Sequence, residues 1–286
     1  MLCAVLWASA VICFTKAGDR INPFRLNLFK NLLITLLLVP TYLLFYAFTW
    51  PEFTGREYGL LIVSGIIGIT FADALYFMTL NYLGAGRTAI MNCLYAPGAL
   101  VFSFFLFGES PNLNGLVGFV LILGGAVLAS MVDEFEKRTR KDLRMGLLCG
   151  VITPLLVAFS IIIIKPVMSN QDVLPVAASR VWIGTLVQLG LLLCGGRLLN
   201  ELNDFRKEPH PWGWMISGTV LGSFLAMLAW TSGFKYASAA LAAVLNQTAT
   251  IWIIVFATLF LKEKLTGKKV MGAALAFAGV LVITLG

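Results

Sequence analysis

Long apolar stretches separated by short polar segments dominate the hydrophobic pattern of this chain. A helix needs about 20 mostly apolar residues to cross roughly 30 Å of hydrocarbon, and the chain divides into ten stretches of about that length. The stretches are continuous and do not alternate with a period of two, so they predict helices and not the strands of a barrel. The ten predicted transmembrane helices cover residues 1–18, 23–48, 58–82, 88–107, 113–132, 145–168, 173–198, 211–233, 237–261 and 268–286.

Composition narrows the class of protein. The chain has 286 residues, of which 59% are hydrophobic and 12% are charged, with a mean hydropathy of +0.89. A soluble domain usually carries about 25% charged residues, so the composition excludes a soluble enzyme, a disordered chain and a nucleic-acid binder. The five cysteines show no metal-ligand or redox spacing, and His210 is the single histidine. We therefore expect no metal site and no cofactor.

The chain contains an internal repeat. A shift of 154 residues aligns 82–127 with 236–281 without a gap, and it matches the polar pairs Asn92/Asn246 and Glu109/Glu263. The copies lie five spans apart, and because five is odd they must cross the membrane in opposite directions. The predicted fold is therefore an all-α integral membrane protein with ten transmembrane helices in two inverted five-helix repeats. The first repeat would cover residues 1–132 and the second 145–286, joined by a charged linker at 133–144. Such repeats are typical of secondary transporters, although the duplication by itself is also compatible with a purely structural role.

Two segments at equivalent positions of the repeat carry a family resemblance. The fourth and ninth spans end in FGESP (107–111) and LKEKLT (261–266), and each is followed by a glycine-containing helix. With the Ala96-Pro97 step in the fourth span, these segments resemble the drug/metabolite transporter superfamily, in particular its EamA-type ten-helix members. Trp7 is similar to a first-span tryptophan of that family, whereas Thr250-Ile251 departs from the small-Pro step. The resemblance implies a secondary transporter, and many family members export amino acids or other small metabolites.

Three charged residues lie deep inside predicted spans. Asp73 is deep in the third span, where an acidic residue costs roughly 2.5–3.5 kcal/mol to insert. It is interpreted either as a carboxyl that carries a proton or meets a cationic group of the solute, or as the partner of Lys30 or Arg180 in a structural ion pair. For Lys30 and Arg180 the alternatives are solute binding and extension of a long side chain to the membrane interface.

Uncharged polar and aromatic residues complete the predicted site. Asn92 and Asn246 occupy matching repeat positions, as expected of groups that face a common axis. Buried amides need hydrogen bonds, which either another helix or a ligand would supply. Glu109 and Glu263 are expected to cap the helices that follow them. The predicted substrate-binding residues are Trp7, Lys30, Asp73, Tyr76, Asn92, Tyr95, Arg180, Trp230, Asn246, Gln247 and Thr250.

These features predict a function. We expect a multi-pass protein of the cell membrane, a monomer or homodimer, that exports a small polar metabolite such as an amino acid by alternating access, with Asp73 as the proton-coupling residue. A passive channel is the alternative. An intramembrane enzyme is not expected, because the sequence shows neither paired deep carboxylates nor a nucleophile with a base. The excess of basic loops on the side away from the termini predicts that this side is cytoplasmic, whereas the family resemblance implies the opposite orientation.

Overall fold

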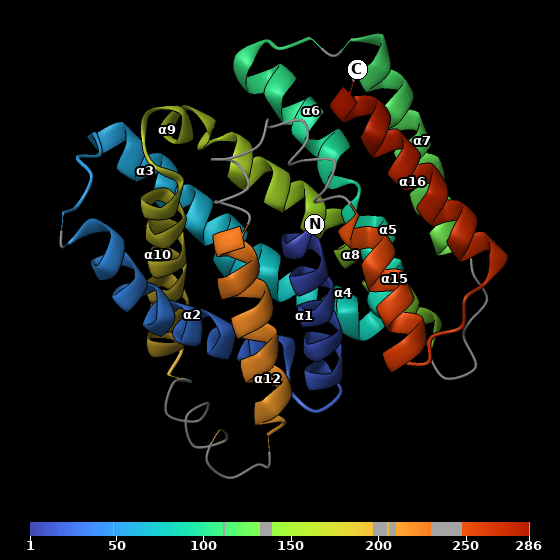
Figure 1. The fold of residues 1–286 in the computed structure, drawn as a ribbon, viewed down its shortest axis with the longest axis horizontal. Helices are drawn as coiled ribbons and strands as arrows, with labels where there is room; N and C mark the ends of the chain where they lie inside the picture. The colour runs from blue at the N-terminus through green and yellow to red at the C-terminus, as the bar shows by residue number, and fades with distance from the viewer. Residues whose placement is uncertain are drawn as a thin grey trace.

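The computed structural model describes residues 1–47, 49–110, 112–131, 139–196, 205, 210–229 and 248–285, and within these ranges all regular structure is helical (Figure 1). Helices of the first half are α1 (Leu2–Gly18), α2 (Pro23–Tyr46), α3 (Gly55–Ser64), the π-helix η1 (Gly65–Ala72), α4 (Asp73–Leu83), α5 (Ala85–Asn92), α6 (Tyr95–Phe107) and α7 (Leu113–Ser130). Helices of the second half are α8 (Arg140–Ile162), α9 (Lys165–Asn170), α10 (Val173–Cys194), α12 (Trp212–Gly218), the π-helix η2 (Thr219–Ala226), α15 (Ala249–Phe260) and α16 (Gly267–Leu285).

Most helical stretches are long and apolar enough to cross a membrane. Among the described residues, eight stretches meet that criterion, and the longest is Gly55–Leu83, which comprises α3, η1 and α4. α1 and α15 are apolar but shorter. Large apolar side chains such as Leu44 (80% exposed) and Phe105 (76% exposed) lie on the outside, where lipid rather than water must cover them. The prediction of an all-helical multi-pass membrane protein is confirmed.

Short polar side chains explain where several helices begin. The Asn22 side chain accepts a hydrogen bond from the backbone N–H of Phe24 at the start of α2. Asn112 accepts from the N–H of Gly115 at the start of α7, and Thr266 accepts from the N–H of Lys269 in the first turn of α16. Capping by such side chains satisfies backbone donors that have no partner within the helix. The prediction that Glu109 and Glu263 cap the helices that follow them is therefore wrong, because Asn112 and Thr266 occupy those positions.

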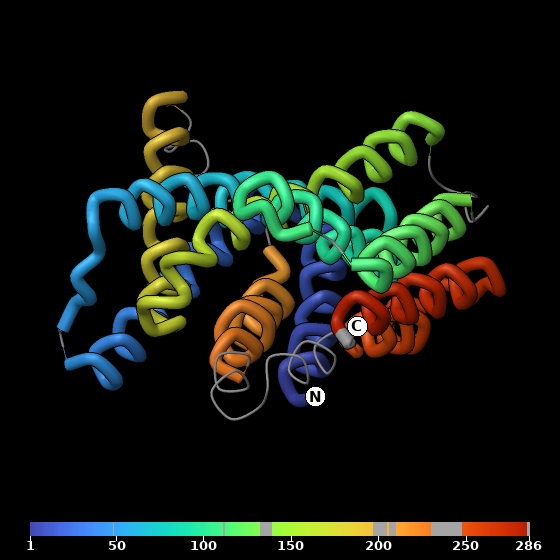
Figure 2. The backbone as a smooth tube through the Cα atoms, turned by 90° about the horizontal axis from the view of Figure 1, so that it is seen from above, coloured from blue at the N-terminus to red at the C-terminus, as the bar shows by residue number. Residues whose placement is uncertain are grey.

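The two halves contact each other in reciprocal pairs. α7 and α16 lie side by side (Figures 1 and 2), with Gly118 against Gly279 and Gly125 against Gly272. A Cβ atom on Gly118 or Gly125 would stand 2.5 Å from the carbonyl oxygen of its partner, so only glycine permits this approach. Residue numbers rise along one helix as they fall along the other, so the two helices are antiparallel.

The first helix of each half packs in the same way on the other half. α1 contacts η2 and α15, and α8 contacts η1 and α6. α2 and α10 also contact each other, and η1 lies against α10. The apolar core next to α1 includes Phe14 and Phe77, whose ring centroids are 5.0 Å apart. This packing leaves α2, η1, α4 and α10 around a group of polar side chains inside the bundle.

Candidate functional site

The candidate site begins where the third span changes its helical geometry. η1 is an eight-residue π-helix that ends at Ala72, and Asp73 is the next residue. Single π-turns inside α-helices frequently occur at functional sites, because they redirect side chains and free backbone carbonyls. Here the carbonyls of Ile69 and Thr70 each accept a hydrogen bond of 3.1 Å from Nδ2 of Asn27 on α2. Hydrogen bonds from α2 to these two carbonyls therefore hold η1 against α2 shortly before Asp73 in the chain.

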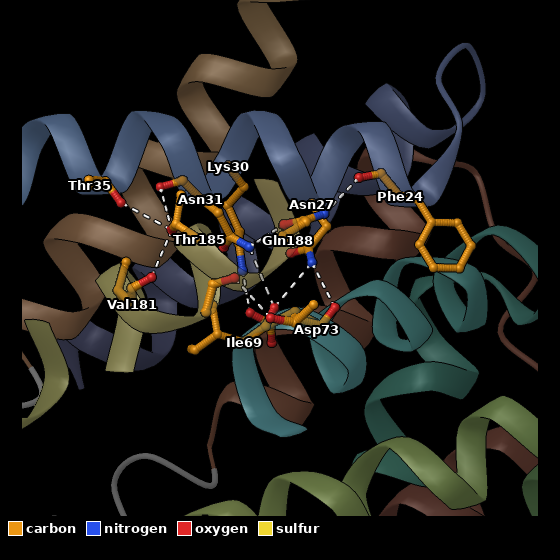
Figure 3. A network of polar contacts seen from close by, with 12 residues as sticks. Phe24, Asn27, Lys30, Asn31, Thr35, Ile69, Asp73, Val181, Thr185 and Gln188 are labelled. Carbon is orange, nitrogen blue, oxygen red and sulfur yellow. Dashed lines mark hydrogen bonds and ion pairs between the residues drawn. The ribbon is translucent and has the colours of Figure 1, made fainter. Parts of the chain in front are cut away.

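Asp73 and Lys30 form an ion pair between α4 and α2 (Figure 3). The Lys30 side chain is 7% exposed and that of Asp73 is 30% exposed, so the carboxylate is the more accessible partner. Removal of one partner from a buried pair leaves the other charge uncompensated and is strongly unfavourable. Because the covered Lys30 ammonium contacts Asp73, the Lys30 side chain points into the bundle and does not extend to the membrane interface.

A network of amides and hydroxyls joins α2 to α10 beside this ion pair (Figure 3). Nδ2 of Asn31 donates to Oε1 of Gln188 at 2.8 Å, and Nε2 of Gln188 donates to the carbonyl of Phe24 at 3.3 Å. The hydroxyls of Thr35 and Thr185 lie 3.1 Å apart. Oδ1 of Asn31, like Oδ1 of Asn27, is buried and has no hydrogen-bond partner among the described residues.

The sequence prediction missed these amides. Asn27, Asn31 and Thr35 follow one another at intervals of four on α2, which places them on one face of the helix. That spacing within an otherwise apolar stretch is the signal that would have identified them. Their partner Gln188 carried no comparable signal, since its contact depends on how α10 crosses α2.

Arg180 on α10 lies on the other side of η1. Its Nη2 donates to Oγ of Ser160 at 3.2 Å, and this is its one hydrogen bond within the described part of the chain. Nε is buried without a hydrogen-bond partner. The guanidinium interacts electrostatically with Asp73 and Tyr95 but forms no ion pair at contact distance with a described residue. Arg180 thus belongs to the same polar region as Asp73 and keeps unused hydrogen-bond donors.

The other predicted site residues lie around this region or outside the described residues. Tyr76 is buried, and its ring centroid is 6.0 Å from that of Trp7. Asn92 and Tyr95 are half-buried, at the end of α5 and the start of α6. Buried Thr250 contacts Sγ of Cys93 through its hydroxyl at 3.7 Å, which joins α15 to the fourth span. The predicted residues outside the described ranges are Trp230, Asn246 and Gln247.

Comparison with known proteins identifies relatives of the whole chain. The model of the EamA-like transporter family matches residues 1–131 and again residues 144–285. An uncharacterized transporter of Archaeoglobus fulgidus is 22% identical over 99% of this chain and 95% of its own length. An uncharacterized transporter of Synechocystis sp. is 22% identical over 81% of this chain, and the match spans 66% of that relative. A WAT1-related protein of Arabidopsis thaliana is 29% identical over 37% of this chain and 30% of its own length.

A solved crystal structure has the same fold. It aligns with 99% of this chain and 95% of its own, with a TM-score of 0.63 and 18% sequence identity. At that identity the likeness concerns the arrangement of the helices and carries no statement about the solute.

Proposed function

Because this chain belongs to the EamA-like transporter family, we propose that it is a secondary transporter that exports a small polar metabolite, such as an amino acid, across the cell membrane. The proposed mechanism is alternating access, and Asp73 is its proton-coupling residue. The observation that carries the proposal is the Lys30–Asp73 ion pair, which lies inside the bundle directly after a π-helix. An ionisable pair in a membrane-spanning segment is costly and is typical of proton relays and solute pathways.

The proposed architecture is a pair of inverted five-helix units at residues 1–132 and 145–286, joined by the linker 133–144. Two observations support it. η1 and η2 start at Gly65 and Thr219, which are separated by 154 residues, the same shift that aligns the sequence repeat. The glycine contacts between α7 and α16 also exchange under that shift, since 118 corresponds to 272 and 125 to 279. Two similar antiparallel halves can exchange conformations and so open a shared site to either side.

The unequal exposure of the two charges supports the proposed proton coupling. The partly exposed Asp73 carboxylate is the group that a proton from water reaches first, whereas Lys30 is covered. A proton on the carboxylate removes its negative charge and therefore the attraction to the Lys30 ammonium. α2 and α4 are then free to separate, and loss of the proton on the other side of the membrane restores the pair. One proton is bound and one is released in each cycle.

The experiment uses purified protein in liposomes that contain a trapped pH-sensitive dye. The twenty proteinogenic amino acids are added in turn under an imposed pH gradient, and the internal pH is recorded. In the wild type we expect at least one of them to cause proton flux. In Asp73→Asn we expect that flux to disappear while exchange of the same solute persists. The exposed residue Asp19 provides a matched control, Asp19→Asn, which should behave as the wild type does.

Two outcomes would contradict the proposal. Unchanged proton flux in Asp73→Asn would remove Asp73 from the coupling mechanism. Solute flux that does not saturate, and that solute on the far side does not accelerate, would indicate a passive channel instead of a carrier.

A further inference from the structure

The two halves place a basic residue at the same position of their second long helix. Lys30 follows the N-cap residue of α2, Asn22, by eight positions, and Arg180 follows the N-cap residue of α10, Asp172, by the same number. Both basic residues reach the polar region around η1 and Asp73. Lys30 and Arg180 therefore occupy the same position relative to the start of the second long helix of their half.

Their acidic partners are not equivalent. In the first half, Asp73 is the residue that follows the π-helix η1. In the second half, the residue that follows η2 is Met227, which packs in an apolar cluster with residues of α2 and α10. Lys30 consequently has a carboxylate partner in its own half. The residue of the second half that corresponds to Asp73 is Met227, whose uncharged thioether cannot pair with Arg180 in the same way.

Arg180 is left with most of its bonding capacity unused. A guanidinium has five N–H donors, and within the described residues Arg180 uses one of them, toward Ser160. Its Nε is buried, and a buried donor without a partner costs free energy. The residue as a whole is half-buried, and the inference requires a small solute to reach the donors that Ser160 leaves unused. Tyr95 lies within electrostatic range, and its hydroxyl makes no hydrogen bond with a described residue.

We infer that the solute supplies the missing anion, and that Arg180 binds a carboxylate group of the solute. This inference rests on the proposed transport function and names its substrate class. The planar guanidinium matches a carboxylate through two parallel hydrogen bonds. Lys30 and Asp73 already compensate each other, so the positive charge that remains at Arg180 is compensated locally by one carboxylate group. A phosphate dianion would leave one negative charge uncompensated inside the membrane, where that charge is costly.

The test measures binding separately from transport. Thermal unfolding of purified protein in detergent is followed by tryptophan fluorescence, with each proteinogenic amino acid, its amide derivative, or inorganic phosphate added at equal ionic strength. A ligand that binds the folded state raises the unfolding temperature. In the wild type we expect at least one amino acid to do so, and its amide derivative, which lacks the carboxylate, to have little effect. In Arg180→Gln we expect binding of that amino acid to weaken about tenfold or more.

Two further variants separate the role of Arg180 from a general effect of charge. Arg180→Lys keeps the charge but loses the planar fork, so its affinity should lie between those of the wild type and Arg180→Gln. Lys165→Gln removes another basic residue of the second half, one that pairs with Glu109 away from the central region. That control should bind the amino acid as the wild type does.

The outcomes distinguish this inference from the proposed function. The inference is overturned if no amino acid stabilises the wild type, if an amide or phosphate stabilises it equally well, or if Arg180→Gln binds with unchanged affinity. The transport proposal survives such a result wherever Asp73→Asn still abolishes proton flux. Conversely, tight binding through Arg180 without any flux in liposomes would support the carboxylate site and contradict transport.

Discussion

A clamp formed by Glu263 joins the two halves, and its removal should destabilise the protein strongly. Oε1 of Glu263 accepts a hydrogen bond of 2.7 Å from the backbone N–H of Ala85, and Oε2 accepts one of 3.2 Å from Gly86. The Lys269 ammonium donates to Oε2 at 2.8 Å. We call these four residues the Glu263 clamp. It caps α5, a helix of the first half, with a carboxylate of the second half.

The size of the expected loss of stability follows from the burial of the Glu263 and Lys269 side chains. The Lys269 side chain is 3% exposed and that of Glu263 is 18% exposed, so water screens the pair only weakly. Glu263→Ala leaves a buried ammonium without its carboxylate and leaves the first N–H groups of α5 without their cap. Loss of one partner of a buried pair costs about 3–5 kcal/mol, and we expect a decrease of that size in the free energy of unfolding. Glu263→Gln keeps a hydrogen-bond acceptor and the size of the side chain, so its free energy of unfolding should decrease by less than that of Glu263→Ala.

The repeat offers a matched control. Glu109 is the residue equivalent to Glu263 and also pairs with a lysine, since Lys165 donates to its carboxylate at 2.6 Å. Both side chains of that pair are about half exposed, at 53% for Lys165 and 52% for Glu109. Water screens such a pair, so Glu109→Ala should lower the free energy of unfolding by much less than Glu263→Ala does.

The measurement is an unfolding titration with sodium dodecyl sulfate from a mild detergent, followed by far-ultraviolet circular dichroism. Equal destabilisation by Glu263→Ala and Glu109→Ala would refute the reasoning, because burial would then not govern the cost. A Glu263→Ala protein as stable as the wild type would show that the clamp contributes nothing.

Two further predictions use the same titration. Gly125→Leu should destabilise the protein by about 1–3 kcal/mol or more, because its Cβ would lie 2.5 Å from the Gly272 carbonyl oxygen. The control is the neighbouring Gly124→Leu, since a Cβ at Gly124 has no atom of another element within 4 Å. Equal effects of the two substitutions would contradict the close packing of α7 on α16. Hydrogen bonds from Lys165 and Ser103 lower the pKa of Glu109, so the stability that this carboxylate contributes is present above its ordinary pKa and is lost as the pH falls through the lowered value. The difference in stability between wild type and Glu109→Gln should accordingly shrink on acidification, and a difference that grows would be contrary to the assigned sign.

The apolar pattern predicted the boundaries of several helices well, because the length of an apolar stretch is a local property of the chain, although the span predicted at 145–168 is α8 at Arg140–Ile162 followed by the separate α9. The stretch predicted at 113–132 is α7 at Leu113–Ser130, and that at 23–48 is α2 at Pro23–Tyr46. The interruption between α5 and α6 also has a local cause. Pro97 has no N–H to donate to the carbonyl of residue 93, and the two helices separate at Cys93 and Leu94.

The contents of the polar region were only partly predictable. Asp73 stood out because a lone acidic residue in an apolar span needs a partner, but the sequence left Lys30 and Arg180 as equal alternatives. The choice between them depends on how α2 and α10 cross η1. The π-helix could not be predicted for the same reason. Gly65 and Gly184 allow η1 and α10 to approach closely, since a Cβ on Gly65 would lie only 2.8 Å from the Arg180 carbonyl oxygen. Contacts of that kind arise from tertiary packing and leave no periodic signal in the sequence.

The unequal halves give a physical reason for a proton to drive the proposed cycle. Alternating access requires two arrangements of similar free energy, and a ligand shifts their balance only if it favours one of them. The ionised Asp73 favours the arrangement in which α4 meets Lys30, whereas the second half has the uncharged Met227 at the equivalent position. A proton on Asp73 makes the two positions alike in charge and so removes the preference. An uncharged residue at position 73 should therefore leave the protein able to exchange solute, at a rate that no longer depends on the pH gradient.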